Sequence, residues 1–531
     1  MAASTRLDST MRANPPVTHR RALSASGILA ISLLALVCGH LLLKYYMPNP
    51  AFGGLGFILV GLIFYYLLFV RRDLFGFILV VYICSDFTFG NNQGGLWNLM
   101  AFGISAAYLL AGPRKERFPR SDRLMMILLG IFILWNVLGW VVRNPMPMVP
   151  ELQGIAEFFG FILMFHLASN VTITKERVRL FLTVTTVLIF YQLLVMLNQR
   201  YPFIRWNTPL LGSYTALGST LNHRIFPSLG TFRHAELGSE YGALQVSLLV
   251  PLLSSSLTQR ELHCGSNRIV ALIMACLFFM ILTDNRSGIV LFVLAIIAYL
   301  LVLPMRLFTS IDRVGRQFRL VMAATLLIPM IGAYVGLSGL EHRFQGLASE
   351  KVSIGRIVSG KDINRGLTES NALRRIGGRS WFIGYGSGIP RSNVWALLGH
   401  DPDKYGVPAG FHSLYLSLPE LYGWIGSLAF VSMIIVTWAR SARVSLRYRK
   451  RKSFLIVLSV GFTMFWSVFL TNEYKISMMR IPNYEMLFWV WLGLSNSVVK
   501  TIRYEQWTKD AAAQHRGKVD EPLQQGMANI V

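Results

Sequence analysis

Charged residues are scarce in this sequence. Asp, Glu, Lys and Arg make up only 15% of the 531 residues, whereas 53% are hydrophobic. A soluble protein typically carries about 25% charged residues. Runs of about eighteen or more mostly apolar residues recur along the whole chain, and each is long enough to cross about 30 Å of hydrocarbon. The shortage of charge therefore excludes an ordinary soluble protein and predicts an all-α, polytopic transmembrane protein.

Cysteine is also rare. The four cysteines are Cys38, Cys84, Cys264 and Cys276, and no two of them form a Cys-x-x-Cys pair. At least three of the four fall in segments that we expect to lie in the membrane. Disulfide frameworks and zinc sites need paired or clustered cysteines, so the sequence predicts neither.

Acidic residues are few beside the basic ones. The chain has 26 Asp and Glu against 51 Lys and Arg, which gives a formal net charge of +25. In a soluble protein such an excess would indicate a nucleic-acid partner. Here Lys and Arg gather in short loops between apolar runs, as they do on the cytoplasmic side of membrane proteins. We therefore expect no nucleic acid among the partners.

The apolar runs predict about fourteen spans (12–14). The polar, basic segment 1–21 precedes the first run without a clean cleavage site, so we expect a cytoplasmic N-terminal tail followed by a retained span. The third span is short and contains Asp86. The predicted spans are 22–46, 51–70, 74–87, 96–112, 124–142, 151–169, 177–197, 236–257, 268–283, 287–304, 319–337, 413–439, 454–471 and 482–499.

The basic loops predict the orientation. With the N-terminus in the cytoplasm, every strongly basic short connection falls on the cytoplasmic side, as the positive-inside rule requires. The first eleven spans then occupy 22–337 and the last three occupy 413–499. The basic cytoplasmic segments are 71–72, 114–123, 174–179, 260–268, 306–319, 440–452 and the C-terminal tail 500–531.

Two longer segments, 198–235 and 338–412, then face the periplasm or the exterior. The second is a polar loop with aromatic residues and amphipathic spacing, so we expect short helices folded over the membrane mouth. The positive-inside rule does not explain the arginines of these segments. A periplasmic anionic ligand explains them, and so does attraction to anionic lipid headgroups. In the loop the basic residues are Arg343, Lys351, Arg356, Lys361, Arg365, Arg374, Arg375, Arg379, Arg391 and Lys404.

Two of the external turns carry polar residues at the membrane edge. Asp284, Asn285 and Arg286 form a tight turn between two spans, and a charge at this depth is a functional candidate by default. Arg286 either pairs with Asp284 or presents its planar fork to phosphate oxygens. His412 opens the span after the loop, where it is either an interfacial anchor or a general base. Beyond it, Pro419, Gly423 and Gly426 allow bending and close helix approach.

Two more segments hold candidate binding residues. In segment 364–388, four arginines precede a Gly-rich turn whose backbone can approach a ligand, although a solvated basic helix face has the same pattern. In segment 230–250, four charged or titratable residues stand at the outer start of a span, either as a structural ion cluster or as part of a site. These residues are Arg365, Arg374, Arg375 and Arg379 in the first segment, and Arg233, His234, Glu236 and Glu240 in the second.

Several familiar patterns carry no weight here. Asp401-Pro402-Asp403 matches the Asp-x-Asp pattern of nucleotide-sugar glycosyltransferases, but it falls on the outer side, where nucleotide sugars are absent. The ten residues between Arg375 and Gly386 match a spacing of some polysaccharide polymerases, yet arginine and glycine are common throughout this region. The chain has no phosphate-binding P-loop, no His-Glu-x-x-His and no Gly-x-Ser-x-Gly.

Three segments together resemble the O-antigen ligase and polymerase superfamily of bacterial inner-membrane proteins. The first is a Thr-x-x-Arg-Ser-Gly step that opens a span, Thr283–Gly288. The second is a long periplasmic loop in which Arg365 is followed by Ala-Leu at 372–373 and Gly-x-Gly at 384–386. The third is a His-x-x-Tyr-Leu-x-x-x-Glu-x-x-Gly-x-x-Gly entry to the next span, 412–426. The resemblance covers roughly 230–430, and the chain departs from the pattern where the family more often has Ser for Asn285 and Asn for Ser413.

The resemblance implies a metal-independent, cofactor-free glycosyltransferase with its active site on the periplasmic face of the inner membrane. It would move a glycan from undecaprenyl diphosphate to a glycan or lipid A core hydroxyl. Arg286 and Arg365 would hold the diphosphate and stabilise its charge, and His412 would orient or deprotonate the acceptor. The further diphosphate-binding candidates are Arg233, Arg374, Arg375 and Arg379. Membrane lipids and a chain-length regulator are the other expected partners.

Within this family we favour a polymerase of an exopolysaccharide, capsule or O-antigen. A ligase to lipid A core and a protein O-oligosaccharyltransferase are alternatives that the sequence does not separate. A flippase or another transporter of lipid-linked glycans is the alternative from a different class. It would tolerate about fourteen spans but does not need a folded external loop.

Overall fold

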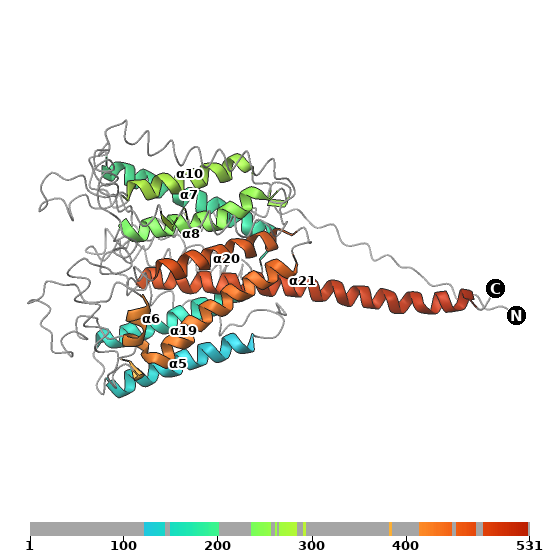
Figure 1. Cartoon of the computed structure of the whole chain (residues 1–531), viewed down its shortest axis with the longest axis horizontal. Coiled ribbons are helices and arrows are strands. Elements are labelled where there is room, and N and C mark those ends of the chain that lie inside the picture. The colour runs from blue at the N-terminus through green and yellow to red at the C-terminus, as the bar shows by residue number, and fades with distance from the viewer. Residues whose placement is uncertain are drawn as a thin grey trace, which may run out of the picture. The chain divides into compact units, whose positions relative to one another are not determined.

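A computed structural model describes part of the chain (Figure 1), and all described residues belong to one compact unit, Phe64–Val531. The regular secondary structure of these residues is entirely α-helical. The described residues are 122–143, 149–171, 173–200, 235–255, 261–262, 265–283, 290–291, 293, 382–384, 414–448, 453–473 and 482–528.

Eight long helices account for most of the described residues, and each overlaps a predicted span. The predicted spans before residue 122, and those at 287–304 and 319–337, lie wholly or largely outside the described residues. The helices are α5 (Arg123–Arg143), α6 (Val149–Ser169), α7 (Lys175–Arg200), α8 (Ala235–Ser254), α10 (Ser266–Leu282), α19 (Leu414–Arg447), α20 (Phe454–Asn472) and α21 (Pro482–Ala528).

Four of these helices contain segments long and apolar enough to cross a membrane: Arg123–Val142, Lys175–Leu197, Leu421–Arg447 and Phe454–Asn472. At 1.5 Å per residue, even the 19 residues of Phe454–Asn472 extend about 28 Å. The described structure is therefore that of a helical membrane protein, as predicted. Two shorter apolar helices run over Phe158–Ser169 and Asn267–Leu282.

The outward faces of the spanning helices are apolar. Leu134 of α5 is 66% exposed, and Val187 of α7 is 60% exposed. In water such surfaces would favour aggregation, whereas hydrocarbon solvates them without cost. The exposed leucine and valine side chains thus fit lipid-facing helices.

An aromatic cluster forms the centre of the packing between α5, α19, α20 and α21. Phe132 of α5 contacts Tyr422, Phe430 and Trp489 at ring-centroid distances of 4.8, 5.5 and 5.7 Å. Phe488 stacks on Phe430 at 5.2 Å. Such pairs add about 0.5–1.5 kcal/mol each beyond the burial of their area, so they fix which faces of these helices meet.

Small and polar residues hold other helix pairs together. A Cβ atom on Gly493 of α21 would lie 2.6 Å from the Cβ of Ala168 in α6, so glycine permits the closest approach there. Ser441 of α19 and Ser495 of α21 share a hydrogen bond of 3.1 Å, and Trp466 of α20 donates to Ser495 at 3.2 Å. Bonds of this kind stabilise helix association in hydrocarbon, where the hydrophobic effect does not act.

Candidate functional site

The seven predicted site residues lie outside the described residues, but the structure describes residues close to several of them. Thr283 stands three residues before the turn arginine, Phe382 three residues after the last arginine of the cluster, and Leu414 two residues after the histidine. These three positions show how the segments that carry the candidates enter the bundle. The predicted site residues are His412, Arg286, Arg365, Arg233, Arg374, Arg375 and Arg379.

Helix α19 is bent at Gly423. This residue has φ 64° and ψ 174°, a left-handed conformation that glycine adopts without steric cost. The predicted span 413–439 therefore consists of a short helix from Leu414 and a spanning helix within Leu421–Arg447. The prediction of bending is confirmed, and Gly423 rather than Pro419 is the position where the backbone leaves the helix.

The Gly-rich stretch of the loop packs directly on this bend. A Cβ atom on Gly384 would lie 2.3 Å from the backbone nitrogen of Gly423, and a Cβ atom on Gly423 would lie 2.3 Å from the carbonyl oxygen of Phe382. Gly384 also has a left-handed φ of 77°. Because neither position admits a side chain, the two backbones meet in a way that only glycine permits. Two of the three sequence segments, 364–388 and 410–430, are thus in contact.

Trp135 of α5 holds the same stretch from the other side. Its indole nitrogen donates a hydrogen bond of 3.0 Å to the carbonyl oxygen of Phe382. Its ring lies edge-on to the ring of Phe382, with 5.6 Å between the centroids. Gly426 allows Trp135 to approach α19, because a Cβ atom there would be 3.4 Å from the indole Cδ1. Residues 382–384 are therefore seated between α5 and the bend of α19.

The short helix before the bend is attached to the ends of α20 and α21. The backbone N–H of Leu414 donates to the carbonyl oxygen of Glu473 at 2.9 Å. The Tyr415 hydroxyl donates to the carbonyl oxygen of Leu470 at 2.6 Å, and the Tyr422 hydroxyl lies 3.5 Å from Glu485 Oε1. These bonds fix the point at which the chain arrives from the loop.

Burial keeps the Tyr415 phenol protonated. Desolvation, with a smaller contribution from the charge of Glu473, raises the pKa of Tyr415 to about 12. The hydroxyl therefore remains a donor to Leu470 at every physiological pH. Glu473 itself is fully buried at the end of α20.

The turn that carries Arg286 begins where the sequence predicted. Helix α10 ends at Leu282 and Thr283 forms its C-cap. The Thr283 hydroxyl, which is 1% exposed, donates to the carbonyl oxygen of Met280 at 2.6 Å. The threonine of the Thr-x-x-Arg-Ser-Gly step therefore helps to end the helix.

Of the polar cluster predicted at the start of α8, only Glu240 has a described environment. It is 1% exposed, and the nearby Gly242 lets α8 approach α10, since a Cβ atom there would lie 3.0 Å from Met280 Cγ. Arg233 and His234 lie outside the described residues. A carboxylate this deep in a helix bundle is expensive unless it is hydrogen-bonded or paired.

Sequence reasoning missed the contributions of Trp135, Glu473 and Glu485. The two glutamates flank the connection between the last two spans, and the rule that singled out Asp284 applies equally to a charge at that membrane edge. No sequence signal identifies Trp135, because its partner Phe382 is 247 positions away. The chain matches no protein-family model, and no match to a curated protein was found.

Proposed function

We propose that this chain is an inner-membrane glycosyltransferase that polymerises oligosaccharide units linked to undecaprenyl diphosphate on the periplasmic face. Its product would be an exopolysaccharide, a capsule or an O-antigen. The observation that supports this most is the contact between Gly384 and Gly423. It joins the stretch that follows the arginine-rich loop segment to the bend of the helix that His412 precedes.

The arrangement of the helix ends agrees with the predicted orientation. Leu414 meets Glu473 at one end of α19, whereas Arg440, near the other end, forms an ion pair with Asp122. Lys500 of α21 donates to the carbonyl oxygen of Ser169 at 3.2 Å. The basic connections and the loop contact thus belong to opposite ends of these helices, as a cytoplasmic and a periplasmic end require.

Chain connectivity limits how far the candidate residues can lie from the described contacts. Successive Cα atoms are 3.8 Å apart, so His412 stays within about 7.6 Å of the Cα atom of Leu414. Arg379 stays within about 11.4 Å of Phe382. Chain connectivity is therefore compatible with a site that combines residues from both segments.

The proposed reaction breaks the bond between the donor sugar's anomeric carbon and the diphosphate oxygen. The acceptor hydroxyl oxygen forms the new bond to that carbon while His412 takes its proton. Undecaprenyl diphosphate leaves with the bonding electrons, and Arg286 and Arg365 neutralise the charge that develops on it. The apolar carrier tail would remain between the spans, which is why a site at the membrane surface suits this chemistry.

Analysis of glycans in a strain that lacks the protein separates this function from its alternatives. A strain that lacks a polymerase carries single repeat units on the final acceptor. Expression of the full-length protein in trans then restores the long polymer. A missing ligase instead leaves long polymer on the lipid carrier. Unchanged glycans in both the carrier and acceptor fractions would contradict the proposed function.

A further inference from the structure

A second site emerges at the opposite end of the helices from the loop contact. A pocket lies among α7, α8, α20 and α21. Its walls are almost entirely leucine, isoleucine, valine, phenylalanine and tryptophan, with Thr185 and Gln245 as the uncharged polar residues among them. An apolar lining of this kind in a membrane protein suits a hydrocarbon chain.

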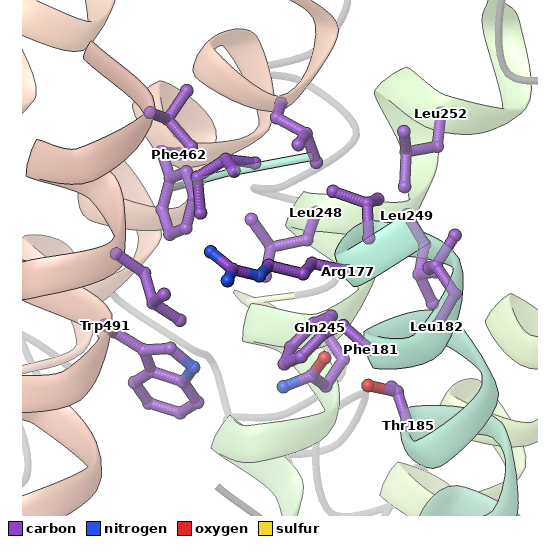
Figure 2. A pocket seen from close by; sticks show the side chains of 15 residues that line it. Arg177, Phe181, Leu182, Thr185, Gln245, Leu248, Leu249, Leu252, Phe462 and Trp491 are labelled. Carbon is purple, nitrogen blue, oxygen red and sulfur yellow. The ribbon is translucent and has the colours of Figure 1, made fainter. Parts of the chain in front are cut away.

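Arg177 is the charged residue that lines this pocket. Figure 2 shows its side chain extended across the pocket toward the side formed by Phe462 and Trp491. Arg177 lies in the first turn of α7, which begins at Lys175, and Thr185 lies about 12 Å further along that helix. The lining therefore changes along α7 from a cation near the start of the helix, the end that we call the mouth of the pocket, to uncharged residues further in.

The surroundings of the mouth are basic. On α7, Lys175 and Arg179 flank Arg177, and both contact Glu261: Lys175 Nζ lies 3.3 Å from its carboxylate, and Arg179 Nη2 donates to its carbonyl oxygen at 2.7 Å. The first turn of α7 also carries Glu176. Lys175, Arg177 and Arg179 therefore outnumber the two glutamates by one, which leaves a small net positive charge at this end.

We propose that this pocket binds one anionic phospholipid of the cytoplasmic leaflet, with its phosphate on Arg177 and one acyl chain in the pocket. A cation at the mouth of an apolar channel reproduces the two halves of such a lipid: an anionic headgroup at the interface and hydrocarbon below it. The guanidinium fork donates two parallel hydrogen bonds to phosphate oxygens. This site is distinct from the periplasmic one and does not depend on the proposed glycan chemistry.

Native mass spectrometry of the delipidated full-length chain, titrated with phosphatidylglycerol or phosphatidylethanolamine, tests the proposal. We expect a single site with a higher affinity for phosphatidylglycerol than for phosphatidylethanolamine. Arg177→Gln should weaken that binding about fivefold, the factor expected when one basic group near anionic lipid is removed. Arg177→Lys should retain part of the affinity, because it keeps the charge and loses the fork.

Arg268→Gln is the matched control. Arg268 belongs to α10 and bonds the hydroxyls of Thr183 and Thr186 on α7 at 3.3 and 3.0 Å, but it does not line the pocket. Its removal should leave the tight lipid site intact. Leu252→Trp, which fills the pocket without changing charge, should displace the lipid from a chain that still melts cooperatively.

Three results would overturn the proposal. One is equal loss of binding in the Arg177 and Arg268 variants, which would indicate only a diffuse surface charge. Another is equal affinity for phosphatidylethanolamine and phosphatidylglycerol. The third is preferential binding of undecaprenyl phosphate at the same residues, which would assign the pocket to the glycan carrier rather than to a phospholipid.

Discussion

The contact between the loop and the bent helix makes a strong prediction for Gly423→Ala. Gly423 has φ 64° and ψ 174°, a backbone region that is essentially restricted to glycine, and alanine there costs about 1–3 kcal/mol. Its Cβ atom would also lie 2.3 Å from the carbonyl oxygen of Phe382, so residues 382–384 must move away. That movement breaks the hydrogen bond from Trp135, which is worth about 1 kcal/mol. The state in which residues 382–384 pack on the bend should therefore be destabilised by about 2–4 kcal/mol, which lowers its occupancy by a factor of about 30–700.

Hydrogen exchange of the peptide that contains residues 382–384 measures this loss directly. In the Gly423→Ala protein the peptide should exchange faster by about the same factor, and glycan polymer length should fall. Gly130→Ala is the control, because Gly130 lies on the same helix as Trp135 and a Cβ atom there meets nothing within 4 Å. Equal exchange in the wild-type, Gly423→Ala and Gly130→Ala proteins would refute the reasoning.

Three further variants test other parts of the account. His412→Ala should abolish polymer growth in membranes, as measured by product size; a variant that retains full transfer would remove the proposed role. Arg286→Lys should reduce transfer at least tenfold, because lysine keeps the charge but not the planar fork. Tyr415→Phe tests the raised pKa of about 12. The folded state favours the neutral phenol, so its contribution is complete below about pH 10 and is lost as the pH approaches 12. Thermal unfolding should show this loss in the wild type and not in Tyr415→Phe.

Hydropathy predicted the described helices well because each must keep a long apolar stretch in the membrane. It placed the ends of α5, α6 and α10 within a few residues of their observed bounds. It did not predict that α21 continues to Ala528, since helical hydrogen bonds persist where the sequence turns polar. Hydropathy reports the solvent around a segment and not the hydrogen bonding of its backbone.

The candidate site was less predictable than the helices. The glycine at position 423 indicated that the helix can bend there. The positive φ of Gly423, however, accompanies the close approach of Gly384, which belongs to a distant segment. The same holds for Trp135, whose role exists only because the fold brings Phe382 to α5. Local patterns identify which residues are able to bend or bind, whereas their partners are chosen by tertiary packing.

The most direct test of the central claim uses the purified full-length protein in liposomes with an undecaprenyl-diphosphate-linked repeat unit as donor. The account predicts that each new linkage in the glycan is matched by one released undecaprenyl diphosphate, and that His412→Ala stops both. Movement of the intact donor across the bilayer without any new linkage would contradict it and assign the protein to lipid-linked glycan transport.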